Sequence, residues 1–132
     1  MDAQLTKNDA FELAKKTLMA CGASEDNALP LANGIVAAEL EGIKSHGFHY
    51  LPIYCLHLQC QKVKGLATPT INSQSPVAFT VDADNGFAHR AITLGFKNLI
   101  PAAKENGIAS LAISNSYTVS YTHLTLPTSD LV

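Results

Sequence analysis

Residues 77–114 read VAFTVDADNGFAHRAITLGFKNLIPAAKENGIASLAIS. Within this stretch, residues 77–81 alternate between large apolar and smaller or polar side chains, which is the period of a half-buried strand. Apolar residues then recur at helical spacing along 88–103, and Gly107 is a natural helix end. The run 108–113 is nearly continuously apolar, which predicts a strand buried on both faces. Strand, helix and strand in this order predict a crossover unit.

The turn between the first strand and the helix is Asp84-Asn85-Gly86. Its free amide groups could meet an anion, but capping of the helix by Asp84 or Asn85 is the favoured interpretation. No G-x-G-x-x-G motif occurs in the chain, so a nicotinamide cofactor would need a fold other than the usual dinucleotide-binding one. Pro101 should distort the last turns of the helix, because it cannot donate to the carbonyl of Lys97.

Three helical segments precede this unit. Thr6, with Asp9 three residues on, and Ser24 are the expected N-caps of the first two helices. The second helix has a wide apolar sector, which indicates packing on two neighbours. A third helix is expected over about residues 50–62, followed by a loop-rich connection over residues 65–76. The predicted fold class is therefore α/β, with N-terminal helices followed by the start of a mixed-sheet layer.

The composition is that of a globular protein. The chain has 132 residues, of which 47% are hydrophobic and 15% charged, and its net charge of -2 argues against a nucleic-acid-binding surface. No run approaches the roughly 20 apolar residues needed to cross a bilayer, and no secretory signal is visible. Three cysteines, an odd number, favour reduced thiols. We expect a cytoplasmic protein that binds neither nucleic acid nor membrane.

Ser45-His46-Gly47 lies at a polar break between the second and third helices, where a side chain can face a cleft. Imidazole titrates near neutrality, so His46 could deliver a proton to a developing alkoxide and recover it in reverse. Gly47 lets a substrate or a neighbouring backbone approach closely. The alternative for so short a motif is a helix-capping or surface histidine.

The remaining histidines and cysteines do not predict a metal site. Cys55, His57 and Cys60 are close in sequence, but at about 100° per residue on a helix Cys55 and His57 point roughly 200° apart. We expect Cys55 to pack in the core and His57 to be solvated. His89, in the first turn of its helix, is expected to be a surface or capping residue.

Residues 38–47, AELEGIKSHG, followed by LPIY at 51–54, resemble the malate/L-lactate dehydrogenase family. The likeness continues through VDADNG at 81–86 and ISNS at 113–116, and it covers about residues 5–119. This family is distinct from the Rossmann-type lactate and malate dehydrogenases. It includes ureidoglycolate, sulfolactate and diketogulonate enzymes and cyclic imino-acid reductases.

The resemblance implies an oxidoreductase that uses NAD or NADP, is usually a homodimer, and has a non-Rossmann cofactor fold built around a mixed sheet. It places His46 at the family's catalytic acid/base position. Ser45 would orient His46 or contact substrate, and Asn115 and Ser116 would belong to a segment that lines the nicotinamide and substrate pocket.

The expected reaction is hydride transfer between NAD(P)H and a small 2-oxo or 2-hydroxy acid such as malate or lactate, with His46 as the acid/base. A cyclic imino-acid reductase of the same family is one alternative. A non-enzymatic interaction module, which would bind a partner through the apolar face of the second helix, is another.

Three departures from the family pattern qualify the resemblance. Tyr50 stands where the family often has Arg, so a substrate carboxylate would meet one hydroxyl in place of a bidentate guanidinium; Tyr50 remains a substrate-binding candidate. Residues 117–120, YTVS, replace the family's usual continuation. Residues 121–128, YTHLTLPT, match nothing in the family and look like translated library-adapter sequence.

These departures set the expected organisation. Residues 1–64 form an N-terminal helical segment, 65–119 the start of the cofactor and substrate domain, and 120–132 a non-native tail. The chain would then be an N-terminal fragment that is inactive by itself.

Overall fold

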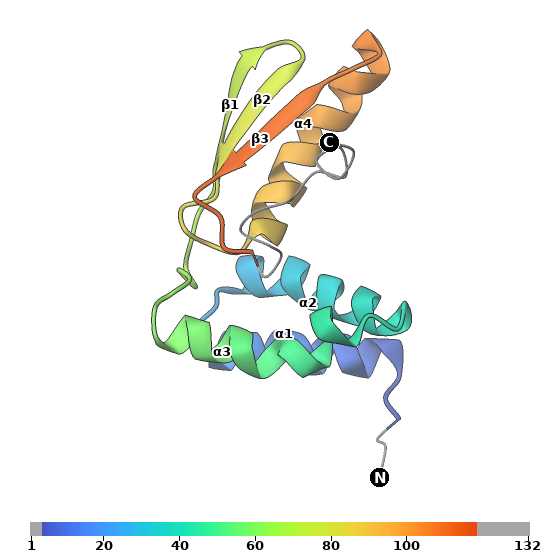
Figure 1. Ribbon diagram of the computed structural model, residues 1–132, viewed down its shortest axis with the longest axis vertical. Helices are drawn as coiled ribbons and strands as arrows, with labels where there is room; N and C mark the ends of the chain where they lie inside the picture. Colours follow the sequence, from blue (N-terminus) through green and yellow to red (C-terminus); the bar gives the residue numbers. More distant parts are fainter. Residues whose placement is uncertain (1–3, 119–132) are drawn as a thin grey trace, which may run out of the picture.

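The computed structural model describes residues 4–118, so the predicted tail over 120–132 lies outside the described residues. The described elements form two layers (Figure 1). Helices α1 to α3 make one layer, and a three-stranded sheet with helix α4 against it makes the other. This arrangement confirms the predicted α/β class with helices ahead of a mixed sheet.

The element bounds follow the predicted helices closely. The α-helices are Lys7–Ala20 (α1), Glu25–Leu40 (α2), Leu51–Gln59 (α3) and Ala88–Asn106 (α4), and the short 3-10 turns are Lys44–His46 (η1) and Phe48–Tyr50 (η2). Thr6 and Ser24 cap α1 and α2 as predicted, because their side chains accept hydrogen bonds from backbone N–H groups three residues on. Helix α3 is shorter at both ends than predicted.

The sheet has the order β1-β2-β3, with strands Thr70–Ser75, Ala78–Asp82 and Ser110–Ser114. Strand β1 pairs antiparallel with β2, and β2 pairs parallel with β3. Helix α4 joins the two parallel strands, which confirms the predicted crossover. It ends at Gly107 in the left-handed conformation, as expected.

Two predictions about the strands are wrong. The connection predicted as loop contains β1, whose sequence TINSQS is polar and mostly exposed; its hydrogen bonds to β2, rather than a period-two apolar pattern, hold it in the sheet. Strand β3 is not buried on both faces, because its residues alternate between half-buried and exposed. Helix α4 covers the side on which Leu111 and Ile113 point, and Ile108 lies before the strand and is 76% exposed.

Helix α2 lies between α1 and α4, as its wide apolar sector predicted. Leu31, Ala32, Ile35 and Val36 are at most 4% exposed, and each of the larger three contributes about 2 kcal/mol of burial free energy. This face is therefore part of the core. The interaction module that would have bound a partner through it is not supported.

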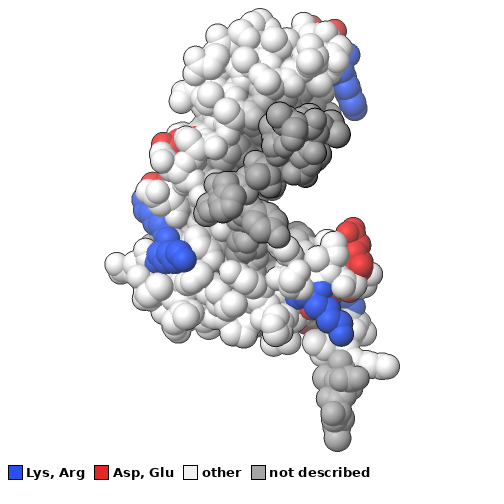
Figure 2. All heavy atoms as spheres, viewed as in Figure 1, with Lys and Arg blue, Asp and Glu red and all other residues white. Residues whose placement is uncertain are grey.

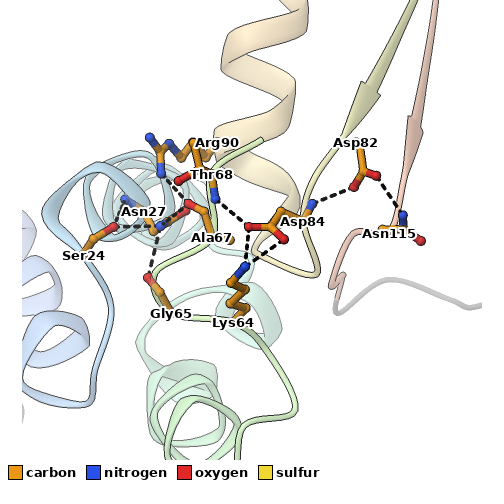
Figure 3. A network of polar contacts seen from close by, with 10 residues as sticks. All are labelled: Ser24, Asn27, Lys64, Gly65, Ala67, Thr68, Asp82, Asp84, Arg90 and Asn115. Carbon is orange, nitrogen blue, oxygen red and sulfur yellow. Dashed lines mark hydrogen bonds and ion pairs between the residues drawn. The ribbon is translucent and has the colours of Figure 1, made fainter. Parts of the chain in front are cut away.

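A buried amide joins the two layers (Figure 3). Asn27 is fully buried, and its Nδ2 donates to Ser24 Oγ (2.7 Å), Gly65 O (3.1 Å) and Ala67 O (2.9 Å). Arg90, near the start of α4, also donates to Ala67 O. These bonds fix the start of α4 relative to α2, and so position the residues between them.

Candidate active site

A cavity of about 220 Å³ lies where α2, α3, the turn η1 and the start of α4 meet. His46 and His89 both line it, from η1 and α4 respectively. Its other lining residues are mostly apolar or small: Leu31, Gly34, Ile35, Tyr54, Ala88, Ile92 and Thr118. The cavity therefore offers two imidazoles against walls that suit a small carbon skeleton.

His46 is exposed and faces this cavity, so the cleft predicted for Ser45-His46-Gly47 is present. Ser45 Oγ lies 3.0 Å from His46 Nδ1, within hydrogen-bond distance. With Nδ1 engaged by the hydroxyl, Nε2 is the nitrogen left for a ligand.

The loop that carries His46 is held by Glu39 from the last turn of α2. Glu39 Oε1 accepts a hydrogen bond of 2.7 Å from the backbone N–H of Phe48. A Cβ on Gly47 would lie 2.2 Å from the same oxygen. A close approach by a substrate or a backbone was predicted at Gly47, but in the structure a side-chain carboxylate approaches it instead.

His89 is not the surface or capping residue that we expected. Its ring packs on Gly34, where a Cβ would lie 2.9 Å from His89 Nε2. Its Nδ1 is buried without a hydrogen-bond partner in the described part of the chain, and the N-cap position of α4 is Phe87. Burial lowers the pKa of His89, so the ring is neutral at neutral pH.

Tyr50 lies in an aromatic cluster. Tyr50 is half-buried, and the centroid of its ring lies 5.0 Å from that of Tyr54. The ring centroids of Tyr54 and Phe87 are 5.7 Å apart, and those of Phe87 and Tyr117 are 5.5 Å apart. Burial raises the pKa of both Tyr54 and Tyr117 to about 12, so these hydroxyls stay protonated. Tyr54, rather than Tyr50, lines the His46 cavity. A substrate contact by Tyr50 stays a prediction.

The prediction of a solvated His57 is wrong, because its half-buried ring is hydrogen-bonded through Nδ1 to the Tyr117 hydroxyl. Burial and the nearby Lys62 lower its pKa. Cys55 packs half-buried against the helical core, as predicted, and burial beside Cys21 raises its pKa to about 12. Among residues 4–118, no group of three His, Cys, Asp or Glu side chains is arranged to hold a metal ion.

Asn115 and Ser116 line a separate cavity of about 360 Å³, together with Lys62, Asn85 and Tyr117. Asn115 Nδ2 donates to Asp82 Oδ2 at 3.1 Å, and Asn115 O accepts from Asn85 N at 2.8 Å. The structure thus does not bring Asn115 and Ser116 into the His46 cavity. The two cavities are lined by consecutive residues, Tyr117 and Thr118.

The structure supports neither the anion site nor the helix cap that the sequence suggested for the turn Asp84-Asn85-Gly86. Its amides are occupied, because Asp84 N donates to Asp82 Oδ1 and Gly86 N to Ala83 O, while Asn85 N is bound as above. Asp84 does not cap α4: it pairs with Lys64 at 2.7 Å and accepts from the N–H of Thr68 at 3.0 Å (Figure 3). The Lys64 hydrogen bond lowers the pKa of Asp84.

Two larger hollows lie elsewhere, and no histidine lines either of them among the described residues. One, of about 550 Å³, includes Arg90 and Lys97 between α2 and α4, and the other, of about 440 Å³, lies between α1 and α2. On the face shown in Figure 2, lysines and arginines form separate small groups. No helix in the described chain is long and apolar enough to cross a membrane.

Local signals in the sequence mark Glu39, which was not predicted as a site residue, and His89, which was expected to be a surface or capping residue. Glu39 is a carboxylate four residues after the buried Ile35, on the side of α2 that faces the core. His89 lies three residues before Ile92, and both line the same cavity. In both cases a polar side chain next to an apolar helix face marked the site.

Comparison with known proteins shows the family. A model of malate/L-lactate dehydrogenases matches residues 5–125, whereas we expected the likeness to end near Val119. The chain is 37% identical over 114 residues to a Delta(1)-pyrroline-2-carboxylate reductase from Ancylobacter novellus, covering 86% of this chain and 33% of that protein. It is 32% identical over 117 residues to a (2R)-3-sulfolactate dehydrogenase (NADP(+)) from Chromohalobacter salexigens, covering 89% and 35%.

Solved structures agree. The delta1-piperideine-2-carboxylate reductase from Pseudomonas syringae matches with a TM-score of 0.85 and 30% identity, over 87% of this chain and 35% of that one. Malate dehydrogenase from Pyrococcus horikoshii matches with a TM-score of 0.79 and 25% identity, over 88% and 33%. The chain spans about a third of the length of the curated relatives it matches. It belongs to the malate/L-lactate dehydrogenase family.

Proposed function

We propose that the full-length protein is an NAD(P)H-dependent reductase of small 2-imino or 2-oxo acids, with His46 as the acid/base. The observation that carries the proposal is the position of His46, next to Ser45 and on the wall of a cavity of about 220 Å³. In the direction of reduction, His46 donates a proton from Nε2 to the nitrogen or oxygen of the reduced double bond and accepts it in reverse. Ser45 orients the ring by its contact with Nδ1.

Of the two substrate classes, we favour cyclic imino acids such as Δ1-pyrroline-2-carboxylate. Leu31, Ile35, Ala88 and Ile92 give the cavity apolar walls, which suit the methylene groups of a ring better than the second carboxylate of malate. The similarity to pyrroline- and piperideine-2-carboxylate reductases supports the same choice.

The residues of the second cavity fit a nicotinamide nucleotide in their donor chemistry. Lys62 carries an ammonium group, and Asn85, Asn115 and Ser116 offer amide and hydroxyl groups, which suit phosphate and carboxamide oxygens. We propose that Asn115 and Ser116 contact this cofactor, as the family resemblance implies. When bound, the nicotinamide supplies the hydride. Homodimer formation and a cytoplasmic location remain proposals for the full-length protein.

The test is an assay of the full-length gene product expressed from the source DNA. NADH or NADPH is offered with Δ1-pyrroline-2-carboxylate, pyruvate and oxaloacetate, and loss of the reduced nicotinamide is followed. We expect turnover of the cyclic imino acid, and a fall of at least about 100-fold in kcat for His46→Ala. Wild-type turnover in a folded His46→Ala variant would refute the role of His46.

A further inference from the structure

We propose that His89 binds substrate in the His46 cavity, where it donates a hydrogen bond to the carboxylate of the acid. The inference rests on the proposed function, because it takes this cavity as the substrate site. It assigns to His89 a role that is separate from proton transfer by His46.

The position of His89 is set by two helices. The residue comes from the first turn of α4, and the edge of its ring that carries Nε2 and Cδ2 packs on Gly34 of α2. A Cβ at residue 34 would lie 2.9 Å from Nε2 and 3.0 Å from Cδ2, so the glycine makes room for the ring. The ring is thereby held in the wall of the cavity that His46 also lines.

The two histidines differ in their hydrogen bonds. Nδ1 of His46 lies 3.0 Å from Ser45 Oγ, whereas Nδ1 of His89 has no partner in the described chain. A buried polar atom without a partner destabilises a fold, and native proteins keep few of them. In this structure the atom is covered by its surroundings, so the proposal includes a turn of the ring that brings Nδ1 to the cavity, where a hydrogen bond to a bound ligand would satisfy it.

The chemistry of the cavity indicates which ligand group it meets. Among the described residues no lysine or arginine lines it, so the imidazoles and the hydroxyls of Tyr54 and Thr118 are the side-chain donors of this part of the chain that do. A neutral His89 ring with its proton on Nδ1 presents one N–H, which a carboxylate oxygen can accept. The start of α4 at Ala88 lines the same cavity, and the positive end of a helix favours an anion there.

Kinetics of two substitutions in the full-length protein test the proposal. His89→Phe keeps a ring but removes both nitrogens, and His89→Asn keeps an N–H donor close to the Nδ1 position. With NADPH and Δ1-pyrroline-2-carboxylate, we expect His89→Phe to raise KM about tenfold or more, while kcat changes less than about threefold. His89→Asn should recover most of the lost affinity.

A binding measurement separates this role from a structural one. Pyrrole-2-carboxylate is a planar ring acid that cannot be reduced in this reaction, and pyrrole-2-carboxamide is its matched probe without the carboxylate. In the presence of NADP+, we expect the acid to raise the Tm of wild type and of His89→Asn, but not of His89→Phe. The carboxamide should raise none of them. Without ligand, the Tm of His89→Phe should be no lower than that of wild type, because the unpaired nitrogen is gone.

Each contrary outcome has one meaning. The proposal is overturned if His89→Phe has the wild-type KM and the wild-type Tm shift on addition of pyrrole-2-carboxylate. It is also overturned if the ligand-free Tm of His89→Phe is lower than that of wild type while the acid still raises it, because His89 is then a structural residue. In both cases a strongly impaired His46→Ala still supports the proposed function. If His46→Ala also turns over at the wild-type rate, the proposed function itself fails.

Discussion

The loop that carries His46 and the turn that follows β2 are held in different ways. Two short 3-10 turns form the loop, and the Glu39 carboxylate ties it to α2 through Phe48. In the turn after β2, Asp84 and Asn85 are both left-handed, with φ of 53° and 58°, and side-chain and backbone bonds link it to Lys64, Thr68 and the end of β3. The loop is thus held by local backbone bonds and one side-chain bond to α2, whereas the turn is held by a network of bonds to segments distant in sequence.

The difference indicates that the two regions have different roles, one in holding the fold and the other in binding and catalysis. The turn after β2 fixes the start of α4, and with it His89, and it holds Asn115 at the second cavity. Lys44–His46 has no buried residue, so this part of the loop can adjust to a substrate with less effect on the core than a change in the turn after β2. Substitutions in the turn should therefore affect stability most, and substitutions in the loop should affect catalysis most.

The largest effect is expected from Gly86→Ala. The new Cβ would lie 2.4 Å from Ala67 Cβ and 3.1 Å from the Ala83 carbonyl, and neither atom can move without shifting backbone. We expect a loss of about 3 kcal/mol in the free energy of unfolding, measured by urea denaturation of the full-length protein. The control is Gly107→Ala, which meets no atom within 4 Å and should lose about 1 kcal/mol through its positive φ. Equal losses in the two variants would contradict the account of the turn.

In the loop, Gly47→Ala should reduce turnover with little effect on Tm. Its Cβ would push the Glu39 carboxylate away from Phe48 N, which loosens the segment that positions His46. We expect kcat/KM to fall about tenfold. Glu39→Ala should lower kcat/KM by the same factor, whereas Glu39→Gln keeps a hydrogen-bond acceptor and should retain most of the activity. The double variant Gly47→Ala with Glu39→Ala should have a kcat/KM no lower than that of either single variant. Additive losses in the double variant would show that the two residues act separately.

A smaller effect is expected from Ser45→Ala, which removes the hydroxyl next to His46 Nδ1. Because this pair is exposed, we expect kcat to fall only about fivefold. Ser45→Thr keeps the hydroxyl and should stay near the wild-type rate. A loss as large as that of His46→Ala would mean that Ser45 takes part in the chemistry itself.

The smallest effect is expected from Asp84→Asn, which removes an exposed ion pair with Lys64. The pKa of Asp84 is lowered in the folded chain, so the charged carboxylate stabilises the fold above its ordinary value of 3.8, and this contribution is lost as the pH falls through the lowered pKa. The Tm of Asp84→Asn should be slightly below that of wild type at pH 7, and the difference should vanish in acid and shrink in high salt. Lys64→Gln should behave alike. A Tm difference that is independent of pH would contradict this.

The helices and the crossover were predictable, because caps, glycine stops and apolar periods are local signals. Strand β1 was not, since its polar sequence depends on pairing with β2. In the site, Ser45 and His46 were found by their motif and its context. The buried position of His89 depends on Gly34, which is 55 residues earlier in the chain and lies against it only after α2 and α4 have packed. The apolar helix face next to His89 is a local signal, but a long-range contact such as that with Gly34 leaves no pattern in the sequence.

The proposed function assigns the proton transfer in the full-length protein to His46. Rescue of His46→Ala by added imidazole tests this assignment, because free imidazole can occupy the space of the missing ring and carry the same proton. We predict that turnover by His46→Ala is at least about 100-fold below wild type and rises with imidazole concentration, while wild type does not respond. Wild-type turnover by His46→Ala in the absence of imidazole would contradict the claim.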